Sequence, residues 1–157
     1  MARNIFRLGT RLTSISTAIT IAQLVAASTV ETVVRDISVS FDGTVVTNAP
    51  TDVQILFQTS GTGTSGATTP APTKVDARTG VAIIATAAYS FSVEPTAGNE
   101  IFRWHVHPQS GYTWQGTPYM DEIVNEANAT ATRNMGIKFA TAPAASIDCD
   151  VYIVAEE

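Results

Sequence analysis

The stretch RDISVSF, from Arg35 to Phe41, decides the fold class of this chain. Apolar residues occupy every second position, and small or acidic polar residues lie between them, which is the period of a β-strand with one buried face. The apolar positions are Ile37, Val39 and Phe41. An Asp-Gly pair follows at 42–43 and favours a tight turn, because glycine accepts the positive φ that such a turn requires. The stretch therefore predicts a half-buried strand that ends in a turn.

The same alternation recurs on the C-terminal side of this strand. The long runs are DVQILFQT (52–59), EIFRWHVH (100–107) and SIDCDVYIVAE (146–156). Shorter runs are YSFSV (89–93), YTWQG (112–116), YMDEIVNEA (119–127) and TATRNMGIKFAT (130–141). About eight strands, separated at regular intervals by turn-forming residues, are typical of an antiparallel sandwich. We therefore expect an all-β, antiparallel β-sandwich that is jelly-roll-like.

Some segments lack the strand pattern. Residues 1–20 are expected to form an extended N-terminal arm, because Gly9 and the many Thr and Ser residues make a free helix marginal. The arm would order against a partner, and a frayed terminus is the alternative. Residues 59–73 are rich in Gly, Ser and Thr and predict a long flexible loop within a single β-sandwich domain, 21–157. The Ala-rich run 81–88 favours a short helix.

Composition and charge limit the kind of protein. A chain of 157 residues suits one domain. The net charge is −5, which argues against a nucleic-acid-binding face because phosphate contacts need clustered Lys and Arg. The apolar run 18–27 is far shorter than the ~20 residues that span a membrane, and a secretory signal is the alternative for it. Neither nucleic acid nor a membrane is therefore an expected partner.

Cys149 is the only cysteine, and we expect it to be a small buried residue. Asp148 and Asp150 flank it and would raise the pKa of the thiol, which disfavours a nucleophilic thiolate. No Gly-x-Ser-x-Gly motif occurs, and the adjacent acids at 121–122 and 156–157 would point to opposite faces of a strand. We therefore expect neither an enzyme nor a cofactor.

The two histidines, His105 and His107, lie on one side of a predicted strand. A His-x-His strand presents both imidazoles on one face, as in the metal sites of cupins and carbonic anhydrases. Such a site needs more ligands, yet there is no third histidine, and positions 108–112 contain no carboxylate. A metal site would have to recruit carboxylates from neighbouring strands: Glu94, Glu100 or Asp121. The favoured interpretation is a polar surface or a subunit contact, which would weaken as the histidines protonate near pH ~6.5.

Four stretches resemble a family of small virion proteins encoded by tailed bacteriophages. They are VSFDGT (39–44), VQILFQTSGTGT (53–64), VEPTAGNEIFRWHVHPQSGYTWQ (93–115) and VYIVAEE (151–157). The resemblance spans roughly residues 35–157 and is a pattern of strands and turns without a catalytic signature. It implies a capsid-associated component, such as a decoration or cement protein.

The expected function is that of a phage structural protein, a cement or decoration protein that stabilises the head by bridging major capsid subunits. It would lie on the capsid surface of a virion assembled in the host cytoplasm, as a trimer or another homo-oligomer. The candidate partner-binding residues are Arg3, Phe6, Arg7, Arg11, His105, His107, Trp114 and Tyr119. A tail, neck or fibre-attachment component and a metal-dependent cupin-like protein are the alternatives.

Overall fold

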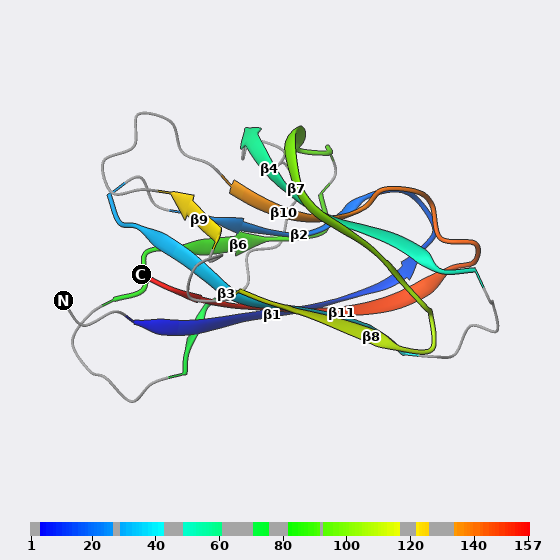
Figure 1. Ribbon diagram of the computed structural model, residues 1–157, viewed down its shortest axis with the longest axis horizontal. Coiled ribbons are helices and arrows are strands. Elements are labelled where there is room, and N and C mark those ends of the chain that lie inside the picture. The colour runs from blue at the N-terminus through cyan, green and yellow to red at the C-terminus, as the bar shows by residue number, and fades with distance from the viewer. Residues whose placement is uncertain are drawn as a thin grey trace.

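The computed structural model describes residues 4–26, 29–42, 49–60, 71–75, 82–91, 93–116, 122–125 and 134–157. These residues form eleven β-strands and no helix. Two antiparallel sheets pack against each other, so the predicted all-β sandwich is confirmed (Figure 1). The strands are β1 (Ile5–Ile15), β2 (Thr20–Val25), β3 (Thr32–Phe41), β4 (Thr51–Ser60), β5 (Thr73–Lys74), β6 (Thr86–Ala88), β7 (Thr96–Val106), β8 (Gly111–Gln115), β9 (Glu122–Asn125), β10 (Asn134–Phe139) and β11 (Ile147–Glu156).

The strand order follows from pairing the beginning of the chain with its end. One sheet runs β5-β1-β11-β3-β8, with β9 also paired to β3, and the other runs β6-β2-β10-β4-β7. Four antiparallel pairs are nested in the sequence: β1 with β11, β2 with β10, β3 with β8, and β4 with β7. Additional pairing of β11 with β3, and of β10 with β4, rolls this long hairpin into two sheets. The result is the jelly-roll arrangement that the sequence predicted.

The core lies between the two sheets and is built from alternate residues of the strands. Ile37 and Val39 of β3, which the alternation predicts to face inwards, are both 0% exposed. Ile55, Ile137 and Ile153 from three other strands join the same core and are at most 1% exposed. Burial of a side chain of this size contributes about 1.5–3 kcal/mol. The repeated strand pattern therefore supplies the main stabilising contact between the sheets.

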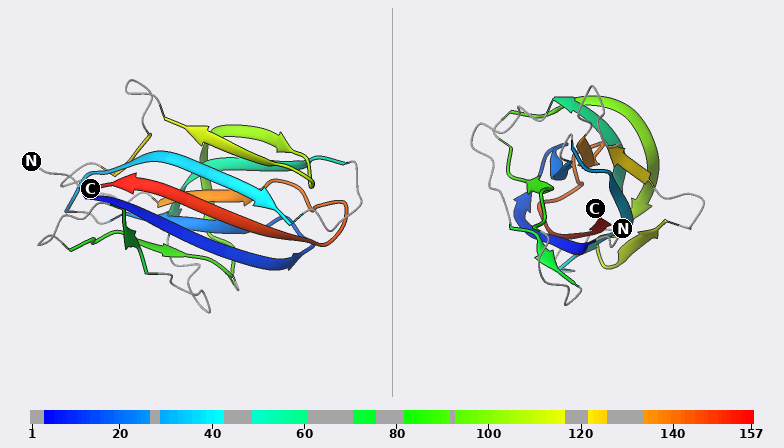
Figure 2. Two further views of the ribbon diagram at one scale, coloured as in Figure 1. Left: turned by 90° about the horizontal axis from the view of Figure 1, so that it is seen from below. Right: turned by 90° about the vertical axis from the view of Figure 1, so that its left-hand side faces the viewer.

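The predicted N-terminal arm is wrong. Residues Ile5–Ile15 form β1, which lies inside its sheet between β5 and β11 (Figure 2). Phe6 and Leu8 enter the core, whereas Arg7 and Arg11 are exposed. A spacing of four residues is a multiple of the strand period of two, so it aligns the arginines on one face of a strand as well as on one face of a helix. The apolar residues at even-numbered positions complete an ordinary half-buried strand.

Two predictions for the segment between β5 and β7 are also wrong. The Ala-rich run forms no helix in its described part, because residues 82–85 are irregular and Thr86–Ala88 form β6. The YSFSV run does not continue as an alternating strand. Ser90 has a φ of 59°, which takes the backbone out of the extended conformation, and Val93 lies in a bend.

Both ends of the predicted loop at 59–73 differ from the prediction, because they belong to strands. Residues 59 and 60 belong to β4, and Thr73 belongs to β5. Residues 61–70 lie outside the described part of the chain.

The placement of β1 predicts a large difference between two adjacent residues. Phe6 is 0% exposed and Ile5 is 38% exposed. Phe6→Ala should reduce the free energy of unfolding by about 3–5 kcal/mol, because it leaves a cavity in the core. The matched variant Ile5→Ala should change it by about 0.5 kcal/mol. Denaturant unfolding of both variants measures this difference, and equal, small effects would mean that the segment is a loose arm after all.

Candidate functional site

The structure separates the predicted partner-binding residues. Arg7 and Arg11 lie on the outer face of the sheet that contains β1, and His105 lies on the outer face of the other sheet. Trp114 is partly buried and packs against the core. Phe6 is fully buried in the core, so its assignment as a partner contact is corrected: its side chain has no surface to offer. The candidates that lie outside the described residues are Arg3 and Tyr119.

The two histidines have different surroundings. The side chain of His105 is 64% exposed, and its Nδ1 lies 4.0 Å from Oδ1 of Asp52. His107 follows the end of β7, where its Nδ1 accepts a hydrogen bond of 3.2 Å from the backbone N–H of Gln109. His105 therefore lies on the sheet surface, while His107 stabilises the turn between β7 and β8.

The carboxylates that a metal site would have to recruit are engaged elsewhere. Glu94 accepts hydrogen bonds from Thr20 and Lys138, and Glu100 accepts hydrogen bonds from Arg103. Asp121 lies outside the described residues. Among the residues that the structure does describe, no three His, Cys, Asp or Glu side chains are grouped so that they could hold a metal ion.

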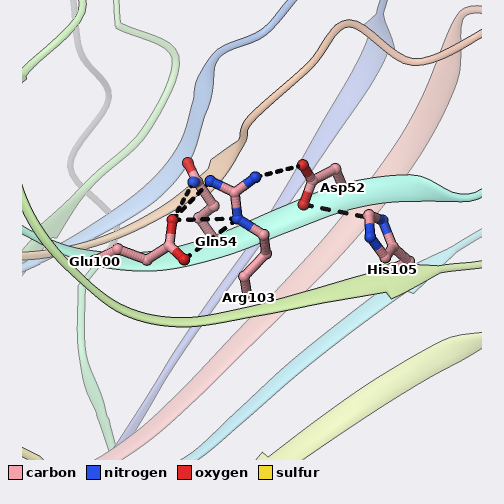
Figure 3. Close-up of polar contacts among 5 residues, drawn as sticks. All are labelled: Asp52, Gln54, Glu100, Arg103 and His105. Carbon is pink, nitrogen blue, oxygen red and sulfur yellow. Dashed lines mark hydrogen bonds and ion pairs between the residues drawn. The ribbon is translucent and has the colours of Figure 1, made fainter.

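Arg103 lies at the centre of a charged network on the outer face of β4 and β7 (Figure 3). Its guanidinium donates to Glu100 at 2.7 Å and to Asp52 at 3.1 Å. Gln54 donates a further hydrogen bond to Glu100. The hydrogen bond from Arg103 holds the pKa of Glu100 below its usual value, and the same contact raises the pKa of Arg103. The network ties an edge strand to its neighbour.

An aromatic row lies where β7 and β8 meet. The rings of Phe102 and Trp104 are 5.5 Å apart, and those of Trp104 and Tyr112 are 5.1 Å apart. Trp104 belongs to the core at 7% exposed, whereas Phe102 and Tyr112 are 38% and 39% exposed. The row therefore anchors β7 and β8, which belong to different sheets, to the core and leaves two aromatic rings partly open to solvent.

Arg11 lies among three aspartates at one end of the sheet that contains β1. Its guanidinium is 3.2 Å from Asp148 and 3.8 Å from both Asp42 and Asp150. Asp148 also accepts a hydrogen bond of 2.9 Å from the backbone N–H of Ser14, a residue with a positive φ of 57°. The Ser14 hydrogen bond, followed by that of Arg11, lowers the pKa of Asp148. Arg11 is thus part of the structure that ends β1.

Arg7 has a different environment on the same face. Its guanidinium carbon lies 5.4 Å from the ring centroid of Tyr152, within the range of a cation–π contact. Arg7 has no carboxylate partner in the described part of the chain, whereas Arg11, Arg35, Arg103 and Lys138 all do. A preorganised guanidinium therefore remains available on the surface.

Gly9 makes this arrangement possible. It pairs with Tyr152 across the β1–β11 ladder, and a Cβ atom at position 9 would lie 2.7 Å from the Tyr152 ring. The ring fills the space that a side chain would occupy, as aromatic residues do opposite glycines in sheets. Sequence reasoning missed both residues, because the partner of Gly9 depends on the register between the two ends of the chain.

A surface groove of about 280 Å³ lies beside Arg7. It is lined by β1 and β11 on one side and by the segment that leads into β5 on the other. The lining residues are Arg7, Gly9, Thr10, Arg11, Ala71, Thr73, Asp150 and Tyr152. Its charged side chains are two arginines and one aspartate, in a chain whose net charge is −5. The groove is a candidate site for a ligand or a partner on this sheet.

Cys149 lies in the core, as the sequence predicted. Burial raises the pKa of its thiol, and the neighbouring Asp150 raises it further. The cysteine is therefore held as an unreactive thiol.

No known protein family, curated protein or solved structure matches this chain. The described residues contain no helix with the length and hydropathy to span a bilayer, and the apolar run 18–27 contributes to strand β2 instead.

The environment of Asp148 predicts a pH-dependent contribution to stability. Because its pKa is lower in the folded state, the charged carboxylate stabilises the fold above the unfolded-state pKa of about 3.9. That contribution is lost as the pH falls from there through the folded-state pKa. Asp148→Asn should therefore lower the free energy of unfolding near pH ~7. The difference in free energy of unfolding between this variant and the natural chain should become smaller as the pH falls below ~4.

Denaturant unfolding between pH ~3 and ~7 measures this difference. Asp36→Asn is the matched control, because Asp36 accepts its hydrogen bond from the neutral side chain of Gln115. A gap between Asp148→Asn and the natural chain that is constant with pH would show that the charge of Asp148 contributes nothing.

Proposed function

We propose that this chain is a phage structural protein that binds the outside of the head as a cement or decoration protein. The resemblance of residues 35–157 to small virion proteins of tailed phages supports the proposal, and the jelly roll is an architecture that viral capsid domains also use. Fold alone does not imply function, so the argument depends on what the surface groups do.

The observation that carries the proposal is the contrast between engaged and available polar groups. Several side chains that could react or bind a ligand are engaged within the structure. The thiol of Cys149 is buried, Arg103 is paired with Glu100 and Asp52, and Arg11 is paired with Asp148. Available groups are of the kind that bind a surface. They are the guanidinium of Arg7 and the exposed rings of Tyr152, Phe102 and Tyr112.

The mechanism would be area burial by a rigid body that contacts neighbouring capsid subunits. Because residues 5–15 are held in the sheet, the contact would use the sheet surfaces instead of an exchanged N-terminal arm. Each copy would add a modest interface, and many copies on one shell would act together to resist the internal pressure of the packaged DNA. Self-association as a trimer or another homo-oligomer would add contacts at a local symmetry axis.

The test is direct binding of the full-length protein to shells assembled from the major capsid protein of the same phage. We expect the protein to co-sediment with shells, to saturate at a fixed ratio to capsid subunits, and to appear at regular positions on the shell in electron micrographs. Decorated heads should also lose their DNA at a higher temperature than undecorated heads. Copies found only at the neck or tail would support the tail-component alternative and contradict the head proposal.

A further inference from the structure

We propose that the groove beside Arg7 is a docking site for one carboxylate side chain carried by a peptide segment of a partner protein. The proposal starts from the geometry of Arg7, which lies over Tyr152 and has no carboxylate partner among the described residues. A guanidinium can form two parallel hydrogen bonds with a carboxylate. The contact with the ring restricts the guanidinium beforehand, so less side-chain freedom is lost when the carboxylate binds.

The surroundings of Arg7 indicate a single negative charge. Arg11, the other basic residue of the groove, is already within 4 Å of three aspartates. One of them, Asp150, also lines the groove. A polyanion such as nucleic acid needs several free cations in a row and would be repelled by these carboxylates. A ligand with one carboxylate can reach Arg7 and avoid them.

The surface next to Arg7 indicates that the carboxylate belongs to a peptide with apolar neighbours. Ile5 lies two residues before Arg7 on the same face of β1 and is 38% exposed. Val75, the residue after β5, is 60% exposed and donates a backbone hydrogen bond of 2.9 Å to Ile5. Tyr152, which lines the groove, is 41% exposed. Arg7 thus has exposed apolar side chains near it as well as the polar groove, which suits an acidic residue next to an apolar one in an extended segment. The identity of the partner as the major capsid protein rests on the proposed function.

The central experiment compares the binding of five variants to shells of the major capsid protein. Arg7→Gln should weaken binding about tenfold or more, as expected for loss of a charge-assisted hydrogen bond. Arg7→Lys should lie between Arg7→Gln and the natural chain, because an ammonium neither stacks flat nor binds bidentately. Tyr152→Leu should weaken binding because it removes the ring, and Tyr152→Phe should not. The matched control Arg103→Gln removes one positive charge from the opposite sheet and should bind normally.

A second measurement keeps the outcome independent of the proposed function. The full-length protein is titrated with the capped tripeptide acetyl-Leu-Glu-Leu-amide, which carries one carboxylate between apolar residues, while NMR follows the side-chain N–H signal of Arg7. We expect that signal to shift with saturation in the natural chain and in Tyr152→Phe, and to shift little in Tyr152→Leu. Inorganic phosphate at the same carboxylate-equivalent concentration should shift it less than the peptide.

The possible results separate the two proposals. If the natural chain does not bind shells but the peptide shifts Arg7, the proposed function fails and the carboxylate site stands. If the natural chain binds shells and Arg7→Gln binds equally well, the groove inference fails and the proposed function stands. Two further results would overturn the inference. One is that the NMR signal of Arg7 does not shift with the peptide and the natural chain does not bind shells. The other is that the natural chain is an oligomer and the Arg7→Gln variant is a monomer. The latter would make the groove a contact between copies of this chain.

Discussion

The antiparallel pairing of β1 with β11 is the constraint on which the rest of the structure depends. It joins the two ends of the chain from Ile5 opposite Glu156 to Ile15 opposite Ile147. Two backbone hydrogen bonds between Asn4 and Glu157, of 2.8 and 3.1 Å, continue the ladder. Every other nested pair lies inside this closure, so each joins residues that are closer in sequence. The entropy cost of closing a loop rises only slowly with its length. Burial of the core side chains of this outermost pair can therefore offset the cost of closing the longest loop.

The same ladder builds the candidate site. Its register places Gly9 opposite Tyr152 and Arg11 opposite Asp150, and it makes Arg7 a diagonal neighbour of the Tyr152 ring. Diagonal neighbours on one face of an antiparallel pair are within reach of long and aromatic side chains. A shift of one residue would turn the arginines into the core and expose Phe6. The hydrophobic side of β1 therefore enforces the geometry of its polar side.

Two separate sets of polar contacts tie residues 84, 85 and 94 to the two sheets. In one set, Glu157 accepts hydrogen bonds from the backbone N–H groups of Ile84 and Ala85, at 2.6 and 3.0 Å. In the other set, Glu94 accepts hydrogen bonds from the backbone and hydroxyl of Thr20. Thr20 continues into a pair of fully buried glutamines, Gln58 and Gln23, which share a hydrogen bond of 2.5 Å. Unpaired, each buried amide would cost about 1–3 kcal/mol, so these contacts help to determine where these residues lie.

These features show what local pattern predicts and what it does not. Strands such as β3 and β11 could be predicted because their alternation is complete, with Ile37 and Ile153 at buried positions. Strand β1 was not predicted, because Gly9 and the regularly spaced arginines are not typical of a strand. Its apolar residues nevertheless alternate as those of a half-buried strand do. The groove could not be predicted, because the contact of Gly9 with Tyr152 joins residues 143 positions apart whose register only the folded ladder determines. The burial of Gln23 and Gln58 could not be predicted either, since polar residues in a strand pattern normally face water.

The integration of β1 changes how the proposed function would operate. An exchanged arm would have to leave the sheet, which would expose Phe6 and Leu8 and leave one side of β11 without its partner strand. Every copy that binds through an exchanged arm would bear this free-energy penalty. A rigid surface that accepts a segment of the partner loses little conformational freedom instead. The partner then supplies the mobile part of the contact, and this chain supplies a fixed guanidinium on a fixed ring. A weak contact of this kind is sufficient on a shell, because many identical copies bind the same repeating surface.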